Sequence, residues 1–361
     1  MKIKLLLISL LISFNLLAKV EISVLTTTPG TEAHTLFGHT AIRVVDESNE
    51  IDKVFNYGLF NFSTPNFLFR VIKGDLDYWL GVQSIEKFIE LNNREKRFIQ
   101  EQKLNLTDRQ ALTFFADLVE NSKSENKFYR YSFTHKNCAT EPAQMLIDYG
   151  YIGGRGSRGE SYRVLMNRYM EGQDWAQFGI NLILGTAVEE EMSWQDGLFL
   201  PDYVKDAVAA SPDLVSETNI LNDFELAEPS AFKKFITSPW FVFSLIAILS
   251  LIIKARWFKV LVFLLVALLG CFITYNTLTT YHVELQSNLN VLWCNPLYLI
   301  LAISLIVKRG ERIMIYSVLG CLAAAILVHL FGIQTYDMQA LPLVIALVIL
   351  QLNHLKKLKL A

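Results

Sequence analysis

Hydrophobic and polar positions alternate in three short stretches near the start of the chain, and a period of two residues predicts β-strands. The stretches are residues 20–25, 38–45 and 53–58. Polar residues separate the last two, which indicates a turn, so these two strands should form a hairpin. A hairpin centred near Ser48 would place Tyr57 opposite His39, with Asn56 one register step away.

Two further stretches carry helix signals. Thr107 and Gln110 have the spacing of a capping box, which predicts a helix over residues 108–121. A second helix is predicted over residues 140–148, with Thr140 as its N-cap and a proline in its first turn. The stretch 61–82 is rich in aromatic residues. This stretch is predicted to lie in the core of the domain. The alternative is that it forms the lip of a lipid-binding groove.

From residue 239 onward the pattern changes to long apolar runs. They lie at residues 239–253, 258–278, 293–307, 313–332 and 339–353. The stretches that follow the first, third and fifth runs are basic, whereas the two remaining connections contain no lysine or arginine. Five spans that start outside would place every basic stretch in the cytoplasm, as the positive-inside rule requires. The pattern therefore predicts five membrane helices.

The N-terminus has the pattern of a signal peptide. Lys2 and Lys4 precede an apolar run that ends at Ala18. This run is short for a membrane span, which needs about 20 residues, so retention as an anchor is the less favoured alternative. Residues 1–18 are thus predicted as a signal peptide, 19–237 as one periplasmic domain with a C-terminal linker, and 238–361 as a transmembrane domain. The linker is expected at residues 211–230.

Composition agrees with this division. The chain is 52% hydrophobic and has a mean hydropathy of +0.31, which is more apolar than an ordinary soluble enzyme. Its net charge of −2 gives no reason to expect a nucleic-acid partner. The membrane itself is the first partner that the composition indicates.

Cys138 is the only cysteine in the polar part of the chain, and the other three lie in or beside apolar runs. A thiol without a local disulfide partner in an exported domain needs another explanation. Its place just ahead of a predicted helix exposes it to the positive end of the helix dipole, which lowers the pKa of a thiol. The sequence therefore favours a thiolate nucleophile at Cys138. The alternative is a small buried core residue.

A thiol nucleophile needs a base, a group that orients the base, and donors for the oxyanion. His39, on a strand that should face the helix, is the predicted base. Tyr57 or Asn56 on the neighbouring strand would orient it. His135, which precedes the cysteine by three residues, is a rival base.

The loop over residues 281–296 should emerge on the same side of the membrane as the exported domain. It is more polar than a plain connector needs, so His282 and Glu284 are predicted to contribute to the site, with a hydrated loop as the alternative. Asn137, beside the cysteine, is predicted in a supporting role. The histidines are too scattered for a metal site, so neither a metal nor a cofactor is expected.

Five short motifs occur in this order: FGHTAIRV at 37–44, VFNYG at 54–58, LNLT at 104–107, NCAT at 137–140 and NVLWCNP at 290–296. Together they resemble the Lnb-type lipoprotein N-acyltransferase family over nearly the whole chain. The resemblance implies an α+β domain similar to permuted NlpC-type papain-like folds, followed by a helical membrane bundle. In such folds the histidine precedes the cysteine, and here His39 precedes Cys138. The resemblance makes Cys138 the nucleophile and His39 the base.

The implied enzyme lies in the bacterial inner membrane with its catalytic domain on the periplasmic side. It would move an acyl chain from membrane phospholipid, through a Cys138 thioester, to the α-amino group of a lipoprotein's N-terminal diacylglyceryl-cysteine. Two alternatives stay open. One is a membrane-anchored periplasmic cysteine peptidase or amidase that acts on cell-wall peptide. The other is a non-catalytic membrane module whose cysteine is structural, bonded for example to Cys294.

Overall fold

The computed structural model describes residues 19–222 and 231–360, so the predicted signal peptide lies outside the described residues. The chain divides into two compact units. In the described residues, the first comprises 19–64, 76–156 and 194–222, and the second comprises 65–75, 157–193 and 231–360. The first two segments of the second unit fall within the stretch predicted as the periplasmic domain. These two segments pack with the apolar helices.

The described part of the first unit is built on a seven-stranded antiparallel sheet with the strand order β6-β4-β3-β2-β1-β5-β9. Its strands are β1 (Val20–Thr27), β2 (His39–Asp46), β3 (Ile51–Leu59), β4 (Asp77–Ser84), β5 (Ile99–Leu104), β6 (Phe128–Arg130) and β9 (Val215–Asn222). The three predicted strands are confirmed as β1, β2 and β3. β9 lies in the predicted linker, and as a largely exposed edge strand it lacks the alternation that would have indicated it.

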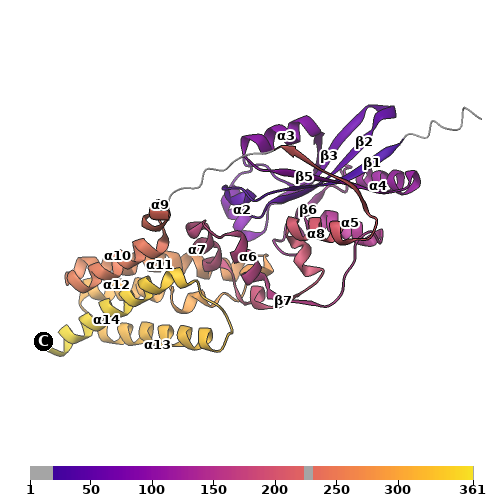
Figure 1. Cartoon of the computed structure of the whole chain (residues 1–361). Coiled ribbons are helices and arrows are strands. Elements are labelled where there is room, and N and C mark those ends of the chain that lie inside the picture. Colours follow the sequence, from indigo (N-terminus) through magenta and orange to yellow (C-terminus); the bar gives the residue numbers. More distant parts are fainter. Residues whose placement is uncertain (1–18, 223–230, 361) are drawn as a thin grey trace, which may run out of the picture. The chain divides into compact units, whose positions relative to one another are not determined.

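Helices cover both faces of this sheet (Figure 1). They are α3 (Ile85–Arg94) on one face, and α4 (Asp108–Asn121), α5 (Thr140–Asp148) and α8 (Pro201–Ala210) on the other. Successive residues of β2 enter the two cores in turn, because side chains alternate along a strand. Ala41 packs under α3, and Ile42 packs in the larger core with α4 and α5. The predicted helix at 108–121 is confirmed, together with its capping box.

The register of the β2–β3 hairpin differs by one residue from the predicted one. The recorded pairs run from Ile42 with Phe55 to Asp46 with Ile51. A shift of one residue exchanges the two faces of a strand. As a result the residue of β3 that shares a face with His39 is Asn56.

The second unit contains the apolar helices. Among the described residues, four stretches are long and apolar enough to cross a membrane: Arg256–Thr279, Val283–Val307, Glu311–Leu330 and Met338–Leu358. The helices of this unit are α2 (Phe67–Lys73), α6 (Tyr162–Tyr169), α7 (Asp174–Ile183), α9 (Ala231–Ile236), α10 (Pro239–Ile252), α11 (Arg256–Thr279), α12 (Leu297–Val307), α13 (Glu311–Leu330) and α14 (Leu341–Leu360), beside the strand pair β7 (Ser157–Ser161) and β8 (Glu191–Ser193). The first predicted span corresponds to the shorter helix α10.

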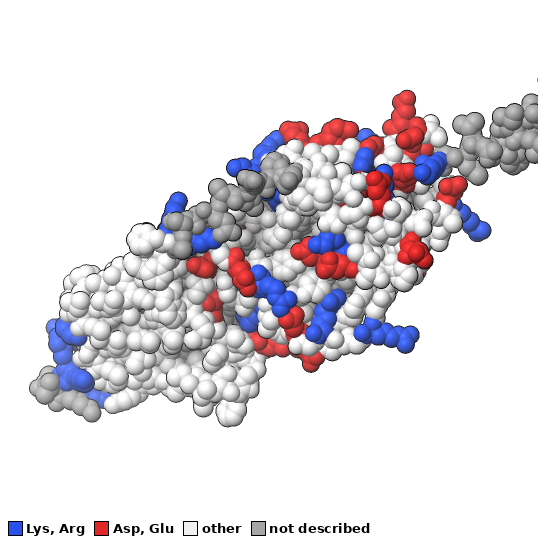
Figure 2. Space-filling view, in the orientation of Figure 1, with Lys and Arg blue, Asp and Glu red and all other residues white. Residues whose placement is uncertain are grey.

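Charged side chains are scarce on the helical bundle, as Figure 2 shows for one face of the molecule. Basic residues gather at the end of the bundle where the C-terminus lies. Near these basic stretches Glu311 lies 3.3 Å from Arg256 and accepts a hydrogen bond of 2.5 Å from His354 Nε2. This buried carboxylate therefore links α11, α13 and α14. Glu311 has Arg256 and His354 as its partners, as an ionisable group within a membrane bundle requires.

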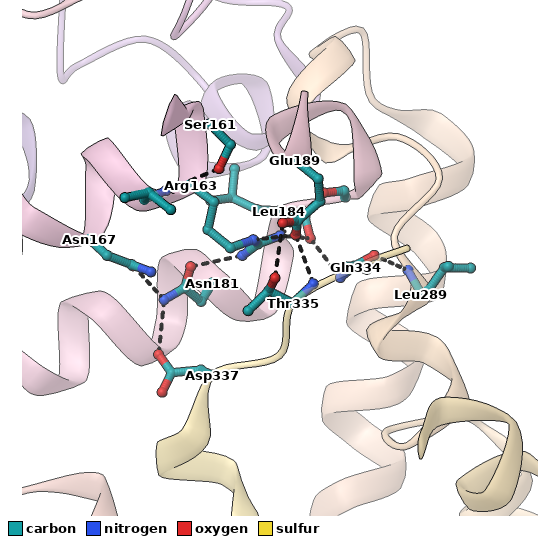
Figure 3. Close-up of polar contacts among 12 residues, drawn as sticks. Ser161, Arg163, Asn167, Asn181, Leu184, Glu189, Leu289, Gln334, Thr335 and Asp337 are labelled. Atoms are coloured by element: carbon teal, nitrogen blue, oxygen red, sulfur yellow. Dashed lines mark hydrogen bonds and ion pairs between the residues drawn. The ribbon is translucent and has the colours of Figure 1, made fainter. Parts of the chain in front are cut away.

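A buried arginine explains why α6 and α7 pack with the membrane helices. The Arg163 guanidinium donates from Nε to Glu189 at 2.6 Å and from Nη1 to Asn181 Oδ1 at 2.8 Å. Asn181 in turn donates from Nδ2 to Asp337 Oδ2 at 2.9 Å (Figure 3). The network thus links both helices to the loop before α14, within the second unit.

The distribution of charge predicts the topology of the bundle. We expect a reporter fused after Arg312 or at the C-terminus to lie in the cytoplasm, and one fused near Ser287 to lie in the periplasm, because basic loops are retained inside. Paired phosphatase and fluorescent-protein fusions measure this directly. A C-terminus in the periplasm would contradict five spans and would exclude the short helix α10 (Pro239–Ile252) as a spanning segment.

Candidate active site

The turn that carries the cysteine is held by the side chain of Asn137. Its Oδ1 accepts hydrogen bonds from the backbone N–H groups of Ala139 at 2.7 Å and Thr140 at 2.9 Å. Its Nδ2 donates to the carbonyls of Phe133 at 2.7 Å and Phe199 at 2.9 Å. The amide therefore uses both donors and both acceptor sites. It also replaces the predicted N-cap, because the Thr140 hydroxyl accepts from the Asn137 N–H at 2.7 Å instead of capping the helix.

Cys138 is a free, partly buried thiol that lies against the ends of β2 and β3. Its sulfur faces the backbone N–H of Thr40 and its own backbone N–H. On β3, Gly58 has a φ of +90°, and a Cβ at this position would lie 3.3 Å from the Cys138 Cβ. A glycine thus permits both the left-handed conformation and the close approach of the strand to the cysteine.

His39 opens β2 and directly precedes Thr40, whose N–H the thiol faces. His39 Nε2 lies 2.5 Å from Asn56 Oδ1. Because this oxygen only accepts, Nε2 carries the ring proton, and Nδ1 of the neutral imidazole keeps its lone pair. The structure therefore places the Cys138 thiol against the backbone of Thr40, the residue directly after His39, and gives His39 an amide that fixes its tautomer.

Burial decides the resting charges of the pair. It raises the pKa of Cys138 to about 11, and the backbone N–H groups and the charge of Arg97 only partly oppose it. It also lowers the pKa of His39 to about 4; Arg97 acts in the same direction and the bond to Asn56 opposes it. At neutral pH these shifts leave Cys138 as a thiol and His39 as a neutral imidazole. The predicted resting thiolate is wrong, because burial outweighs the field at the start of the helix.

Arg97 is a residue of this site that the sequence did not indicate. Its buried guanidinium donates to Thr27 Oγ1 at 3.0 Å and pairs with Glu95 at 2.8 Å. Its positive charge acts on both Cys138 and His39. No local pattern marks it, because only the folding of β1 against β5 brings it near the cysteine.

Tyr57 and His135 do not take part in the His39–Asn56 contact. The Tyr57 hydroxyl accepts from Asn121 Nδ2 at 3.2 Å and donates to Met145 Sδ at 3.4 Å, on the face of the sheet that α4 and α5 cover. Of the two residues predicted to orient His39, Asn56 is therefore the one that contacts it. His135 is exposed, and its Nδ1 lies 2.6 Å from the neighbouring Thr134 hydroxyl.

His282 and Glu284 are buried residues of the second unit, so the alternative of a hydrated loop is wrong. His282 Nε2 donates to the Val71 carbonyl at 2.9 Å, and adjacent groups of its loop bind the next two carbonyls at the end of α2. The Glu284 carbonyl accepts from the Gly185 N–H at 2.7 Å. The loop thus supplies the partners that a helix C-terminus lacks.

The fold and this site define a class: a membrane protein whose extracytoplasmic α+β domain carries a cysteine, a histidine and an asparagine in one place. Residues 13–154 match the family model of the Lnb N-terminal periplasmic domain, and residues 231–359 match that of the Lnb transmembrane domain. The chain belongs to the Lnb family, as its motifs predicted. No significant match was found among curated proteins or among solved structures.

The charges of the resting pair predict how its reactivity depends on pH. Alkylation of Cys138 by iodoacetamide should be slow at pH 7 and rise about tenfold per pH unit until the pH nears the thiol pKa of about 11, because only the thiolate reacts. His39 should stay deprotonated, and so able to act as a base, until the pH falls toward its pKa of about 4. Stopped-time alkylation followed by intact mass measures the first curve. A plateau already reached at pH 7 would show a preformed thiolate and overturn this assignment.

Proposed function

We propose that this protein is a lipoprotein N-acyltransferase of the bacterial inner membrane. The observation that carries the proposal is the placing of Cys138 beside the β2 end that bears His39, with Asn56 fixing the ring, in a periplasmic domain joined to membrane helices. A nucleophile at a helix start, a base on a strand and an amide behind the base are the parts that a permuted papain-like site requires. We infer that the domain has this NlpC-type architecture.

The first step would load the thiol. As Cys138 Sγ attacks the ester carbonyl of a phospholipid, its proton passes to His39 Nδ1 and a C–S bond forms. The tetrahedral intermediate collapses when the C–O bond to glycerol breaks. The glycerol oxygen takes the proton from the imidazolium, and a lysophospholipid leaves. The result is a thioester on Cys138 and a neutral His39.

The second step would unload it. The α-amino group of a lipoprotein's diacylglyceryl-cysteine attacks the thioester, and a C–N bond forms as the C–S bond breaks. His39 takes a proton from the amine and returns it to the departing thiolate of Cys138. The products are an N-acylated lipoprotein and the free thiol. Each step is redox-neutral and uses the same base in both directions, so no cofactor is required.

A cavity in the second unit supports phospholipid as the donor. Its volume is about 560 Å³, and Lys234, Asp174 and Trp240 are among the residues that line it. Cationic and carboxylate groups together suit a zwitterionic head group, whose phosphate and ammonium need opposite partners. Tryptophan is the residue that favours the level of the head groups.

Tethering by membrane helices suits this reaction. Donor and acceptor are both held in a membrane, so a catalyst anchored there meets them at a greatly raised effective concentration. Exposed apolar residues occur on α2 of the same unit, where Leu68 and Phe69 are 70% and 67% exposed. An exposed apolar pair on a short helix fits contact with lipid, and it favours the lipid-groove alternative for part of the aromatic stretch.

The proposal is tested by incubating the full-length protein with phospholipid vesicles and measuring the mass of the peptide that contains Cys138. We expect the mass of one acyl chain, lost after hydroxylamine treatment, and no adduct in Cys138→Ser. Addition of a diacylated lipoprotein should discharge the adduct and place the chain on the lipoprotein N-terminus. Cleavage of cell-wall peptide without an acyl adduct would instead support a peptidase or amidase. The absence of both an adduct and cleavage would support a non-catalytic module.

Substitutions should separate the roles within the site. Cys138→Ala should abolish transfer, and His39→Ala should lower its rate by about a hundredfold or more, the scale for a positioned base. Asn56→Ala should cost less, because it orients the base without replacing it. Rates are measured by mass spectrometry of the lipoprotein N-terminus.

His135→Ala and Tyr57→Phe are the matched controls, and both should transfer at near wild-type rates, because His135 is exposed and the Tyr57 hydroxyl binds Asn121 and Met145. Activity in His39→Ala combined with its loss in His135→Ala would show that the base is misassigned.

We also propose that the loop over residues 281–296 takes part in transfer. His282→Ala or Glu284→Ala should lower the rate by about tenfold, equivalent to about 1.4 kcal/mol of transition-state stabilisation. His282→Gln is the control for folding, because its amide N–H can still donate to the Val71 carbonyl. It should keep the wild-type melting temperature and still lose activity. Wild-type transfer in His282→Gln and Glu284→Gln would show that the loop serves the fold alone.

A further inference from the structure

Tyr129 carries a buried hydroxyl that the reaction described above does not use. The residue lies on β6, where it pairs with Tyr78 of β4. Its hydroxyl is shielded from solvent and has no hydrogen-bond partner among the residues that the structure describes. Buried polar groups are nearly always paired, so an unpaired hydroxyl indicates either a cost to the fold or a partner that arrives with the substrate.

The position of this hydroxyl relative to the thiol favours the second explanation. Gly58 leaves a space that a Cβ would fill, and this point is 3.3 Å from the Cys138 Cβ and 3.8 Å from the Tyr129 hydroxyl oxygen. The same segment of β3 carries an irregularity between Asn56 and Leu59, where its pairing with β4 shifts. Such bulges redirect side chains next to active sites. The cysteine and the phenol therefore border one small space beside Gly58.

Charge adds to the argument. Burial raises the pKa of Tyr129, and the nearby Cys138 thiolate would raise it further, so the phenol stays protonated throughout the working pH range. A neutral phenol is a hydrogen-bond donor and not a base. The backbone N–H of Cys138 is directed at the sulfur of Cys138 itself. The Tyr129 O–H borders the space beside the cysteine and the Cys138 N–H lies at its sulfur. A side-chain O–H together with a backbone N–H is the kind of donor set that an oxyanion hole uses.

We propose that the Tyr129 hydroxyl donates a hydrogen bond to the oxyanion that forms when Cys138 attacks a carbonyl carbon. The inference rests on the proposed function only in that Cys138 is the nucleophile. As the C–S bond forms, the carbonyl π electrons move onto oxygen, and the Tyr129 proton stays on the phenol while it binds that oxygen. When the C–O bond to the leaving alcohol breaks, the electrons return to re-form the carbonyl. The hydroxyl is then unpaired again.

Tyr129→Phe in the full-length protein tests this with two reagents. The first is p-nitrophenyl butyrate, whose attack by Cys138 passes through an oxyanion and releases a coloured burst. The second is iodoacetamide, whose displacement at a saturated carbon forms no oxyanion. We expect the burst rate to fall by about a hundredfold, the usual effect of losing one such donor, and the alkylation rate to stay within twofold.

Tyr151→Phe is the matched control, because Tyr151 also has a buried hydroxyl without a partner among the described residues but packs against Tyr149 and Phe114. It should leave both rates unchanged. Wild-type burst kinetics in Tyr129→Phe, or an equal loss in both reactions, would overturn the inference. So would the absence of a burst in the wild-type protein. A wild-type burst that depends on Tyr129 without any N-acylation of lipoprotein would refute the proposed function and leave this inference standing.

Discussion

The withdrawal of the Cys138 thiol from water is the constraint on which the rest of the site depends. A thiolate at a helix start gains from the dipole and from nearby N–H groups, but these gains act on a charge that burial makes costly. Here burial is the larger effect, so the sulfur keeps its proton and His39 stays neutral. In the proposed reaction, proton transfer from Cys138 to His39 must then occur within the attack itself, which requires a ring held in one tautomer. Asn56 supplies that, at 2.5 Å from Nε2.

A buried reactive group also requires a rigid frame, and Asn137 provides it. Its amide forms hydrogen bonds to four backbone groups: two at the start of α5, the Phe133 carbonyl just before it, and the Phe199 carbonyl of a distant segment. In a low-dielectric site a fully paired amide stabilises the turn, whereas a substitution would leave several backbone groups without partners. Gly58 has the complementary role, because its missing side chain leaves room beside the thiol. The position of the Cys138 turn is thus set by Asn137, and the space beside the thiol is left by Gly58.

Local patterns predicted the local parts of this structure. Alternation marked β1, β2 and β3, and the Thr107 capping box marked the start of α4, because both signals lie within a few residues. The predicted hairpin register was wrong by one residue, because the centre of a polar turn cannot be located from its sequence. That shift determines whether Asn56 or Tyr57 shares a face of the sheet with His39. The edge strand β9 carries no alternation. Arg97 and the packing of α6 and α7 with the membrane helices depend on contacts between distant segments, which no window along the chain contains.

A neutral resting pair fits acyl transfer better than a preformed ion pair would. An imidazolium and a thiolate hold water around them, and that water must leave before an acyl chain can approach. Water that stays is also a competing nucleophile, because a thioester can be hydrolysed as well as aminolysed. A thiol beside a neutral ring avoids both problems, since charge develops only after the acyl group has displaced solvent. The cost is a slower free thiol, which the proposed acyltransferase could tolerate because a lipid donor is at high local concentration in the membrane. In the proposed reaction, the burial that keeps water away from Cys138 would therefore protect its thioester from hydrolysis and favour transfer to the amine.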